Sequence, residues 1–198
     1  MKLFNQLKSL TVTLGTLGSL AMAVGCGGDS DAPLSELYGI YELTDWTENE
    51  ASCDAEGASV LADKIEKYML VKEGEFLFVR FVSAETCESL ESCRAAAEDE
   101  TINLSGFLFE SGSDSNGWVG SSASASGMGG DTCSGIFNEY RMTAPTSTTL
   151  ELVRTRHDVA DVGKDADDFC DLDEVSARGP NEPCVSRSVL SATFVEGI

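Results

Sequence analysis

Residues 65–82 read IEKYMLVKEGEFLFVRFV, two apolar runs joined by four polar residues. The runs, 65–71 and 76–82, are rich in the aromatic and β-branched side chains that favour strands. Gly74, in the polar link 72–75, predicts the turn of an antiparallel hairpin. Both runs place apolar residues at successive positions. We therefore expect strands that are buried on both faces, as in a barrel wall partly covered by a helix or loop.

Similar patterns along the chain predict a mainly β protein of eight strands. Most neighbouring strands are joined by short links, which favours antiparallel pairing, and closure of eight such strands removes exposed sheet edges. The expected fold is an eight-stranded antiparallel up-and-down barrel with one or two short helices, at 87–99 and within 165–178; an antiparallel β-sandwich is the alternative. The expected strands are 37–46, 65–71, 76–82, 102–109, 117–125, 134–143, 148–156 and 188–195.

Several links between these strands carry recognisable turn residues. Asn116-Gly117 predicts a tight turn, and the proline in 144–147 predicts the turn of a second hairpin. In the segment 111–130, 13 of the 20 residues are Ser or Gly. We expect a flexible flap there; an edge strand and a place of close backbone approach are the alternatives.

The first expected strand also carries a family resemblance. Residues 37–43 read LYGIYEL and are followed by Trp46. This pattern resembles the Gly-x-Trp start of lipocalin and lipocalin-like domains, with Tyr41 in place of the family's tryptophan. The resemblance implies a lipocalin-like barrel over most of residues 36–198, although lipocalins carry their helix after the eighth strand and the expected helix here precedes it.

The N-terminal segment has the composition of an export signal. Lys2 and Lys8 precede an apolar stretch, 10–24, that is shorter than the roughly 20 apolar residues needed to span a bilayer. The residues Ala23-Val24-Gly25-Cys26 resemble a bacterial lipobox, with alanine where leucine is usual.

This resemblance implies that the chain is cleaved before Cys26, which becomes acylated and anchors the protein. Gly27, where an aspartate would retain the protein at the inner membrane, implies sorting to the outer membrane. The expected organisation is a signal peptide at 1–25, a lipidated cysteine and flexible tether at 26–35, and a β-barrel domain at 36–198. Plain secretion, with cleavage after Ala21-Met22-Ala23, is the alternative.

The charge of the chain excludes one class of partner. With 13 basic and 34 acidic residues, the formal net charge is −21; loss of 1–25 with its two lysines leaves 11 basic residues and a charge of −23. Such a surface repels nucleic acid and anionic lipid. We therefore expect no nucleic-acid partner, and the sequence does not indicate a protein partner.

Seven cysteines suit an exported protein. If Cys26 is acylated, six remain, and an even number in an oxidising compartment predicts three disulfides. Of the 15 pairings we favour Cys170–Cys184. We expect Cys87 and Cys93 to lie too far apart on a regular helix to pair with each other, so that one or both pair with Cys53 or Cys133.

The sequence shows no pattern typical of catalysis or of a cofactor. His157, the one histidine, is followed by Asp158, which would point to the opposite face of a strand. The acidic run 161–174 lacks the spacing and glycine of a calcium loop, so we expect a solvated loop, with weak calcium binding left open. A zinc site is not expected, because the sequence has neither a second histidine nor a Cys-x-x-Cys pair. We therefore predict a protein that is not an enzyme and has no catalytic residue, metal or cofactor.

The barrel interior is the remaining candidate site. An eight-stranded barrel is just wide enough to be filled by side chains or to hold one small ligand. If it holds a small apolar or lipid-like ligand, Tyr41, Leu43, Phe81 and Trp118 would line the pocket. Two hypotheses therefore remain: a lipid-anchored ligand binder, and a structural or partner-binding surface lipoprotein with a packed core. An exported hydrolase is less favoured.

Overall fold

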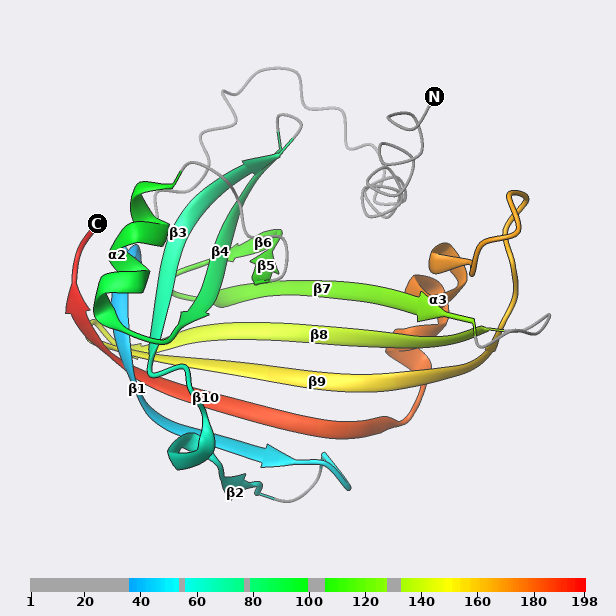
Figure 1. Ribbon diagram of the computed structural model, residues 1–198, viewed down its shortest axis with the longest axis horizontal. Coiled ribbons are helices and arrows are strands. Elements are labelled where there is room, and N and C mark those ends of the chain that lie inside the picture. Colours follow the sequence, from blue (N-terminus) through cyan, green and yellow to red (C-terminus); the bar gives the residue numbers. More distant parts are fainter. Residues whose placement is uncertain (1–35, 54–55, 77–78, 100–105, 128–132) are drawn as a thin grey trace. The chain divides into compact units, whose positions relative to one another are not determined.

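The computed structural model describes residues 36–53, 56–76, 79–99, 106–127 and 133–198. Within these ranges the protein is mainly β, with two short α-helices (Figure 1). The strands are β1 (Gly39–Asn49), β2 (Ala58–Ser59), β3 (Tyr68–Phe76), β4 (Val79–Cys87), β5 (Phe107–Phe109), β6 (Ser111–Ser113), β7 (Gly117–Ser126), β8 (Cys133–Thr146), β9 (Thr149–Val162) and β10 (Cys184–Glu196). The helices are α2 (Leu90–Glu98) and α3 (Leu172–Arg178), with 3-10 turns η2 (Leu61–Asp63) and η3 (Gly179–Asn181).

Nine of the described strands follow one another around a nearly closed antiparallel barrel. Their order is β5-β4-β3-β1-β10-β9-β8-β7-β6. Strands that follow one another in the chain are therefore neighbours in this order, except that β1 lies beside β3 and that β5 and β6 form its two ends; β1 also pairs with β10. The two ends of this path, β5 and β6, are separated in the chain by Glu110 alone. The sequence predicted eight strands. The additional one is Ser111–Ser113, which pairs with β7 within the segment expected to be a flap.

Both predicted hairpins exist, but their strands extend into the links that were predicted to form the turns. Gly74 is inside β3 and pairs with Phe81, and the pair Phe76–Val79 closes the ladder; residues 77 and 78 lie outside the described residues. The side chain of Phe81 explains the glycine, because a Cβ at Gly74 would overlap its ring. Pro145 likewise lies within β8, and β9 starts at Thr149.

A turn is present at the predicted place, but it consists of residues 114–116, and Gly117 is the first residue of β7 instead of a turn residue. Ser113 pairs with Gly117 at the end of the β6–β7 ladder, and the Asn116 N–H donates to the Ser113 carbonyl at 3.2 Å. Gly117 has φ +81°, a conformation that glycine adopts without steric cost. The helix predicted at 165–178 is shorter, Leu172–Arg178, and residues 102–105 of the predicted fourth strand lie outside the described residues.

The helix α2 covers the outer face of the wall formed by β1 and β3. It begins at the N-cap Ser89, which forms a capping box with Ser92, and continues through three alanines that favour helix. Ile40 and Leu70, on that outer face, pack with Cys87 and Cys93 in one buried cluster. Met69 and Val71 of the same strand β3 pack on the inner face. The prediction of a wall buried on both faces is therefore confirmed for this part of the barrel.

The chain divides into two compact units. The barrel strands meet within Asp31–Ser121, Glu139–Arg156 and Cys184–Ile198, which we call the barrel unit. Ser122–Asn138 and His157–Pro183 belong to the other unit, which contains α3 and which we call the helix–loop unit.

Candidate functional site

The interior of the barrel unit collects three of the four residues predicted to line a ligand pocket. Tyr41, Leu43 and Trp118 are 2%, 5% and 4% exposed and belong to one buried cluster. Phe81 is only half-buried and lies outside that cluster. Its neighbours Val82 and Ala84 supply the inner face of β4, so the expectation that Phe81 points inward was wrong.

This interior cluster is closely packed. Met69, Val71, Phe109, Met142, Leu152 and Leu190 are 0% exposed. A void large enough for water beside any of these side chains would leave part of its surface accessible. The middle of the barrel is therefore filled by side chains around these residues.

Polar groups at the rim of the cluster are satisfied within the fold. The Tyr41 hydroxyl donates to the Leu37 carbonyl at 2.8 Å, and the Trp118 indole N–H donates to Asp114 at 3.0 Å. The other oxygen of the Asp114 carboxylate accepts from the Glu36 N–H at 2.7 Å. Burial, followed by the charge of Asp114, raises the pKa of Tyr41 to about 12, which keeps the hydroxyl protonated as a donor.

The segment 56–63, between β1 and β3, also contributes to the interior. Its residue Leu61, in η2, and Trp46, in β1, pack against the cluster. The Val60 N–H donates to the Trp46 carbonyl at 2.7 Å, and the Lys64 ammonium lies 4.5 Å from the centre of the Trp46 ring. The Trp46 indole N–H is buried and has no hydrogen-bond partner among the described residues.

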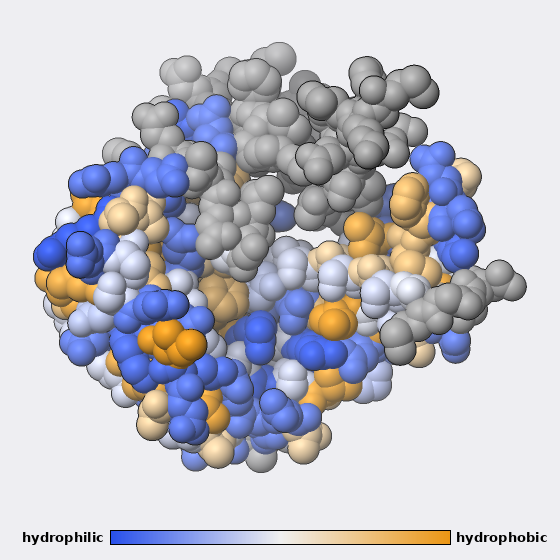
Figure 2. All heavy atoms as spheres, viewed as in Figure 1, coloured by the Kyte–Doolittle hydropathy of each residue, from blue (hydrophilic) through white to orange (hydrophobic). Residues whose placement is uncertain are grey.

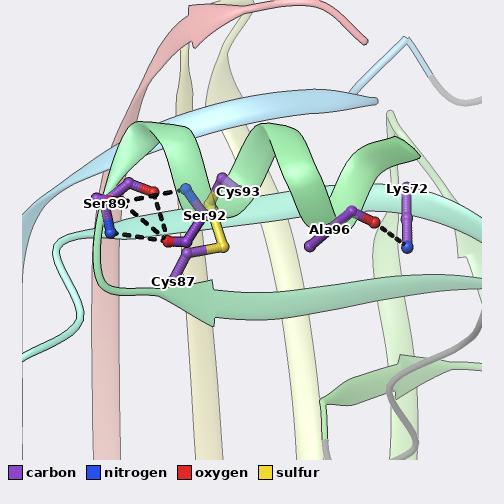
Figure 3. The surroundings of a disulfide bond; sticks show 6 residues. All are labelled: Lys72, Cys87, Ser89, Ser92, Cys93 and Ala96. Atoms are coloured by element: carbon purple, nitrogen blue, oxygen red, sulfur yellow. Dashed lines mark hydrogen bonds between the residues drawn. A yellow bond between two sulfur atoms is a disulfide. The ribbon is translucent and has the colours of Figure 1, made fainter. Parts of the chain in front are cut away.

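The helix α2 is attached to the barrel at both of its ends (Figure 3). Cys93 in its first turns forms a disulfide with Cys87 at the end of β4, with their Cα atoms 5.5 Å apart. At the other end, Lys72 of β3 is 9% exposed, and its ammonium donates to the carbonyls of Ala96 at 2.6 Å and Asp99 at 3.0 Å. A cation at this position satisfies the free carbonyls of a helix C-terminus and complements its dipole.

The six cysteines expected to pair do form three disulfides, but with other partners than the sequence favoured. The pairs are Cys53–Cys184, Cys87–Cys93 and Cys133–Cys170. Cys170–Cys184 is therefore wrong. The argument against Cys87–Cys93 was also wrong, because Cys87 belongs to strand β4 and only Cys93 is helical.

The helix–loop unit has a small core and a network of charged groups. Val175 of α3 packs with Phe137, Val159 and Val162. Arg178 donates to Glu174 at 2.6 Å, to Glu182 at 3.1 Å and to the Ala160 carbonyl at 2.9 Å, which ties α3 to β9.

Two further groups of this unit are held by main-chain contacts. The Gly163 N–H and, after it, Arg178 stabilise the charged form of Glu174 and lower its pKa. His157 is 7% exposed, its Nδ1 lies 2.7 Å from the Glu182 carbonyl, and its ring lies beside Phe137. This places the histidine as a structural contact between β9 and the segment after α3.

The loop 163–171 of the helix–loop unit presents the aromatic ring of Phe169 to solvent. Phe169 is 69% exposed, and each residue from 164 to 168 is exposed as well. Cys170 ties the loop to Cys133 at a Cα distance of 5.7 Å. The sequence interpretation missed Phe169, although an isolated aromatic residue within the acidic run 161–174 was a visible signal.

On the face that Figure 2 draws, the described surface is predominantly polar. Figure 2 shows hydrophilic residues over most of the described surface on the face drawn, with hydrophobic residues in small separate groups. The exposed large hydrophobic residues are Ile65, Val119, Phe169, Phe194, Val195 and Ile198. Among the described residues, no three His, Cys, Asp or Glu side chains are grouped to hold a metal ion. No helix within the described ranges has the length and apolar character needed to cross a membrane.

Comparisons with known proteins identify no relative of this chain. No protein-family model, no curated protein and no solved structure matches the chain. The predicted lipidation site Cys26 lies outside the described residues. Function therefore has to be argued from the residues themselves.

Proposed function

We propose that this chain is a lipid-anchored envelope lipoprotein that is not an enzyme and acts through its surface, as a structural or partner-binding module. Its acylated Cys26 would hold it at the outer membrane, and residues 26–35 would form the tether. The observation that carries the proposal is the filled barrel interior, in which Met69, Phe109 and Leu152 are fully buried. A barrel of about this strand number is just wide enough to be filled in this way.

The disulfides support export. All three join cysteines of the described residues, and together they use every cysteine of the chain except Cys26. Disulfides persist in oxidising compartments and are rare in the cytosol. The cysteine left over is the one in the lipobox-like sequence, where acylation would use its thiol.

The assignment of the barrel as lipocalin-like is part of this proposal. The next-neighbour order of the strands and the pairing of β1 with β10 agree with an up-and-down barrel. A helix between β4 and β5 and another before β10 do not follow the lipocalin arrangement.

A small apolar ligand is the second candidate. It is favoured by the Trp46 indole N–H, a buried donor without a hydrogen-bond partner among the described residues. Because burying such a donor without a partner costs roughly 1–3 kcal/mol, a ligand carrying an acceptor would stabilise the protein there.

Native mass spectrometry of the exported chain distinguishes the two candidates. The Cys26→Ala variant avoids heterogeneity of the lipid and is used for this measurement. We expect a bare mass, six hydrogens below that of the reduced chain because three disulfides have formed. A discrete additional mass that is lost on denaturation would show a bound ligand and contradict the packed-barrel proposal.

Membrane fractionation tests the anchor. The wild-type chain should pellet with membranes, and Cys26→Ala should move to the soluble fraction, because more than one acyl chain is needed for stable attachment and the variant has none. Cys53→Ala is the matched control, since it removes a cysteine but leaves the lipobox-like sequence intact. A Cys26→Ala variant that still pellets would overturn the assignment.

A further inference from the structure

The loop 163–171 holds a large apolar side chain where water surrounds it. Phe169 is 69% exposed and belongs to a short segment between β9 and α3. Burial of a phenylalanine side chain stabilises a protein, and most of that stabilisation is not realised for Phe169 in this fold. The ring is therefore available to a partner.

The loop is ordered by its own hydrogen bonds. The Asp165 N–H donates to the Phe169 carbonyl at 2.7 Å, and one oxygen of the Asp165 carboxylate accepts from the N–H groups of Asp167 and Phe169, both at 2.9 Å. The Asp171 N–H donates to the Gly163 carbonyl at 3.0 Å. A preorganised loop loses little conformational entropy when it binds, so more of the contact energy appears as affinity.

The charges around the ring indicate the kind of partner. Asp165, Asp167 and Asp168 are exposed beside Phe169, and the one basic residue of the loop, Lys164, is paired with Asp168 at 3.0 Å. An anionic lipid surface and nucleic acid are repelled by this loop and by the net charge of −21. Arginine fits it best, because a guanidinium stacks on an aromatic ring and binds carboxylates through paired hydrogen bonds.

We propose that the loop 163–171 is the docking surface for a protein partner that presents an apolar pocket rimmed by arginine, with Phe169 as the anchor. This inference rests on the proposed function, that the chain acts through its surface. Aromatic residues at the centre of an interface carry a large share of the binding energy, and acidic residues at its rim contribute mainly to association rate and salt dependence.

The test uses a random peptide library displayed on phage, selected on the full chain with its disulfides formed. We expect the enriched peptides to combine arginine with apolar residues. A synthetic copy of the most enriched peptide should bind Phe169→Ala at least tenfold more weakly than wild type. Asp167→Asn should weaken binding a few-fold and reduce its dependence on salt.

Ile65→Ala is the matched control, because Ile65 is 68% exposed and lies in the barrel unit. It should bind the peptide as wild type does. Both substitutions replace exposed side chains, so equal thermal midpoints will show that the variants are folded. Enriched peptides that lack arginine, or that bind Phe169→Ala as tightly as wild type, would overturn the proposal.

Flotation with vesicles tests the alternative that the ring binds a membrane. Phe169-dependent binding of Cys26→Ala to phosphatidylcholine vesicles would assign the ring to a membrane and overturn the protein-docking proposal. The proposed function fails by a different observation, a ligand mass in the barrel. A bare mass together with a loop that binds no basic peptide would refute this inference alone.

Discussion

In the barrel unit, 14 described residues form one buried cluster, whereas the core of the helix–loop unit contains five. The smaller unit adds a disulfide, Cys133–Cys170, and the ion pairs of Arg178 with Glu174 and Glu182. Small cores supply little free energy of folding and usually need such covalent or polar support. The barrel unit contains two disulfides of its own but also the larger apolar cluster, so the difference teaches that the smaller core depends more on its single cross-link and its ion pairs.

The largest expected effect is loss of the disulfide in the helix–loop unit. Cys133→Ala combined with Cys170→Ala opens a loop with a sequence separation of 37 and should lower the free energy of unfolding by about 4 kcal/mol. Hydrogen exchange should show the loss of protection in the helix–loop unit, while the barrel strands keep theirs.

The matched control is the double variant Cys87→Ala and Cys93→Ala. Its loop has a sequence separation of only six, so we expect a loss of about 2 kcal/mol. Equal loss of protection in both units of the Cys133 and Cys170 variant would show that the two units do not differ in the way described.

Leu152→Ala tests the contribution of the barrel core. Leu152 is 0% exposed within the interior cluster, so its truncation leaves a cavity and should lower the free energy of unfolding by about 3 kcal/mol. Urea unfolding measures the change. Ile65→Ala, at a position that is 68% exposed, should change it by less than about 0.5 kcal/mol. A small effect of Leu152→Ala would indicate a loosely packed interior with room for a ligand.

The substitution Lys72→Met tests whether the stability of the barrel unit also depends on local polar contacts. The substitution keeps the length of the apolar stem but removes the donor to the Ala96 and Asp99 carbonyls, at a cost of about 1.5 kcal/mol. Hydrogen exchange should show increased opening of α2.

Arg80→Met, at an exposed position of the same hairpin with ion pairs of 3.4 and 3.7 Å, is the control and should cost less than about 0.5 kcal/mol. Unchanged protection of α2 in Lys72→Met would exclude the lysine as its C-terminal support.

We expect the smallest effects from changes in pH. Acid should lower the stability contributed by Glu174 of the helix–loop unit, and alkali that contributed by Tyr41 of the barrel unit. The pKa of Glu174 is lowered in the folded protein, so its contribution is present above the unfolded value and is lost as the pH falls through the folded one. The pKa of Tyr41 is raised from 10.0 to about 12, so its contribution is present below pH 10 and is lost as the pH rises through 12. Glu174→Gln should reduce the acid sensitivity, and Tyr41→Phe the alkaline sensitivity, of urea unfolding.

Asp173→Asn provides the control for the acid limb, since Asp173 is exposed on the same helix. If it reduces acid sensitivity as much as Glu174→Gln, the Glu174 contacts do not contribute specifically.

Local patterns in the sequence predicted the parts of the fold that depend on neighbouring residues. Tyr41 and Leu43 were correctly expected on the inner face of the same strand, because the side chains of a strand alternate with a period of two. The β-rich composition and the Asn116-Gly117 turn were equally informative.

Features that depend on contacts distant in sequence were not predictable. Gly74 suggested a turn, but it lies within β3, where the ring of Phe81 on the neighbouring strand occupies the space that a Cβ would need. The disulfide partners depend on where strands end, and Cys87 lies one element earlier than the helical pattern suggested. Phe169 was not recognised because its exposure depends on the conformation of the loop 163–171, which the local sequence does not reveal.

The pairing of the first and last strands determines how the protein responds to mechanical load. The β1–β10 ladder runs from Ile40 and Glu196, near the start of β1 and at the end of β10, to Asn49 and Arg187. A force that pulls the ends apart therefore opens this antiparallel ladder one hydrogen bond at a time, like a zip, instead of shearing all its bonds together.

Just beyond the last pair of this ladder, Cys53 is bonded to Cys184. Opening of the ladder stops there, because every residue between these two cysteines lies inside a covalently closed loop that bears no tension. A protein pulled at both ends would therefore lengthen by no more than the chain outside this loop, which includes the β1 and β10 segments, for as long as the disulfide holds.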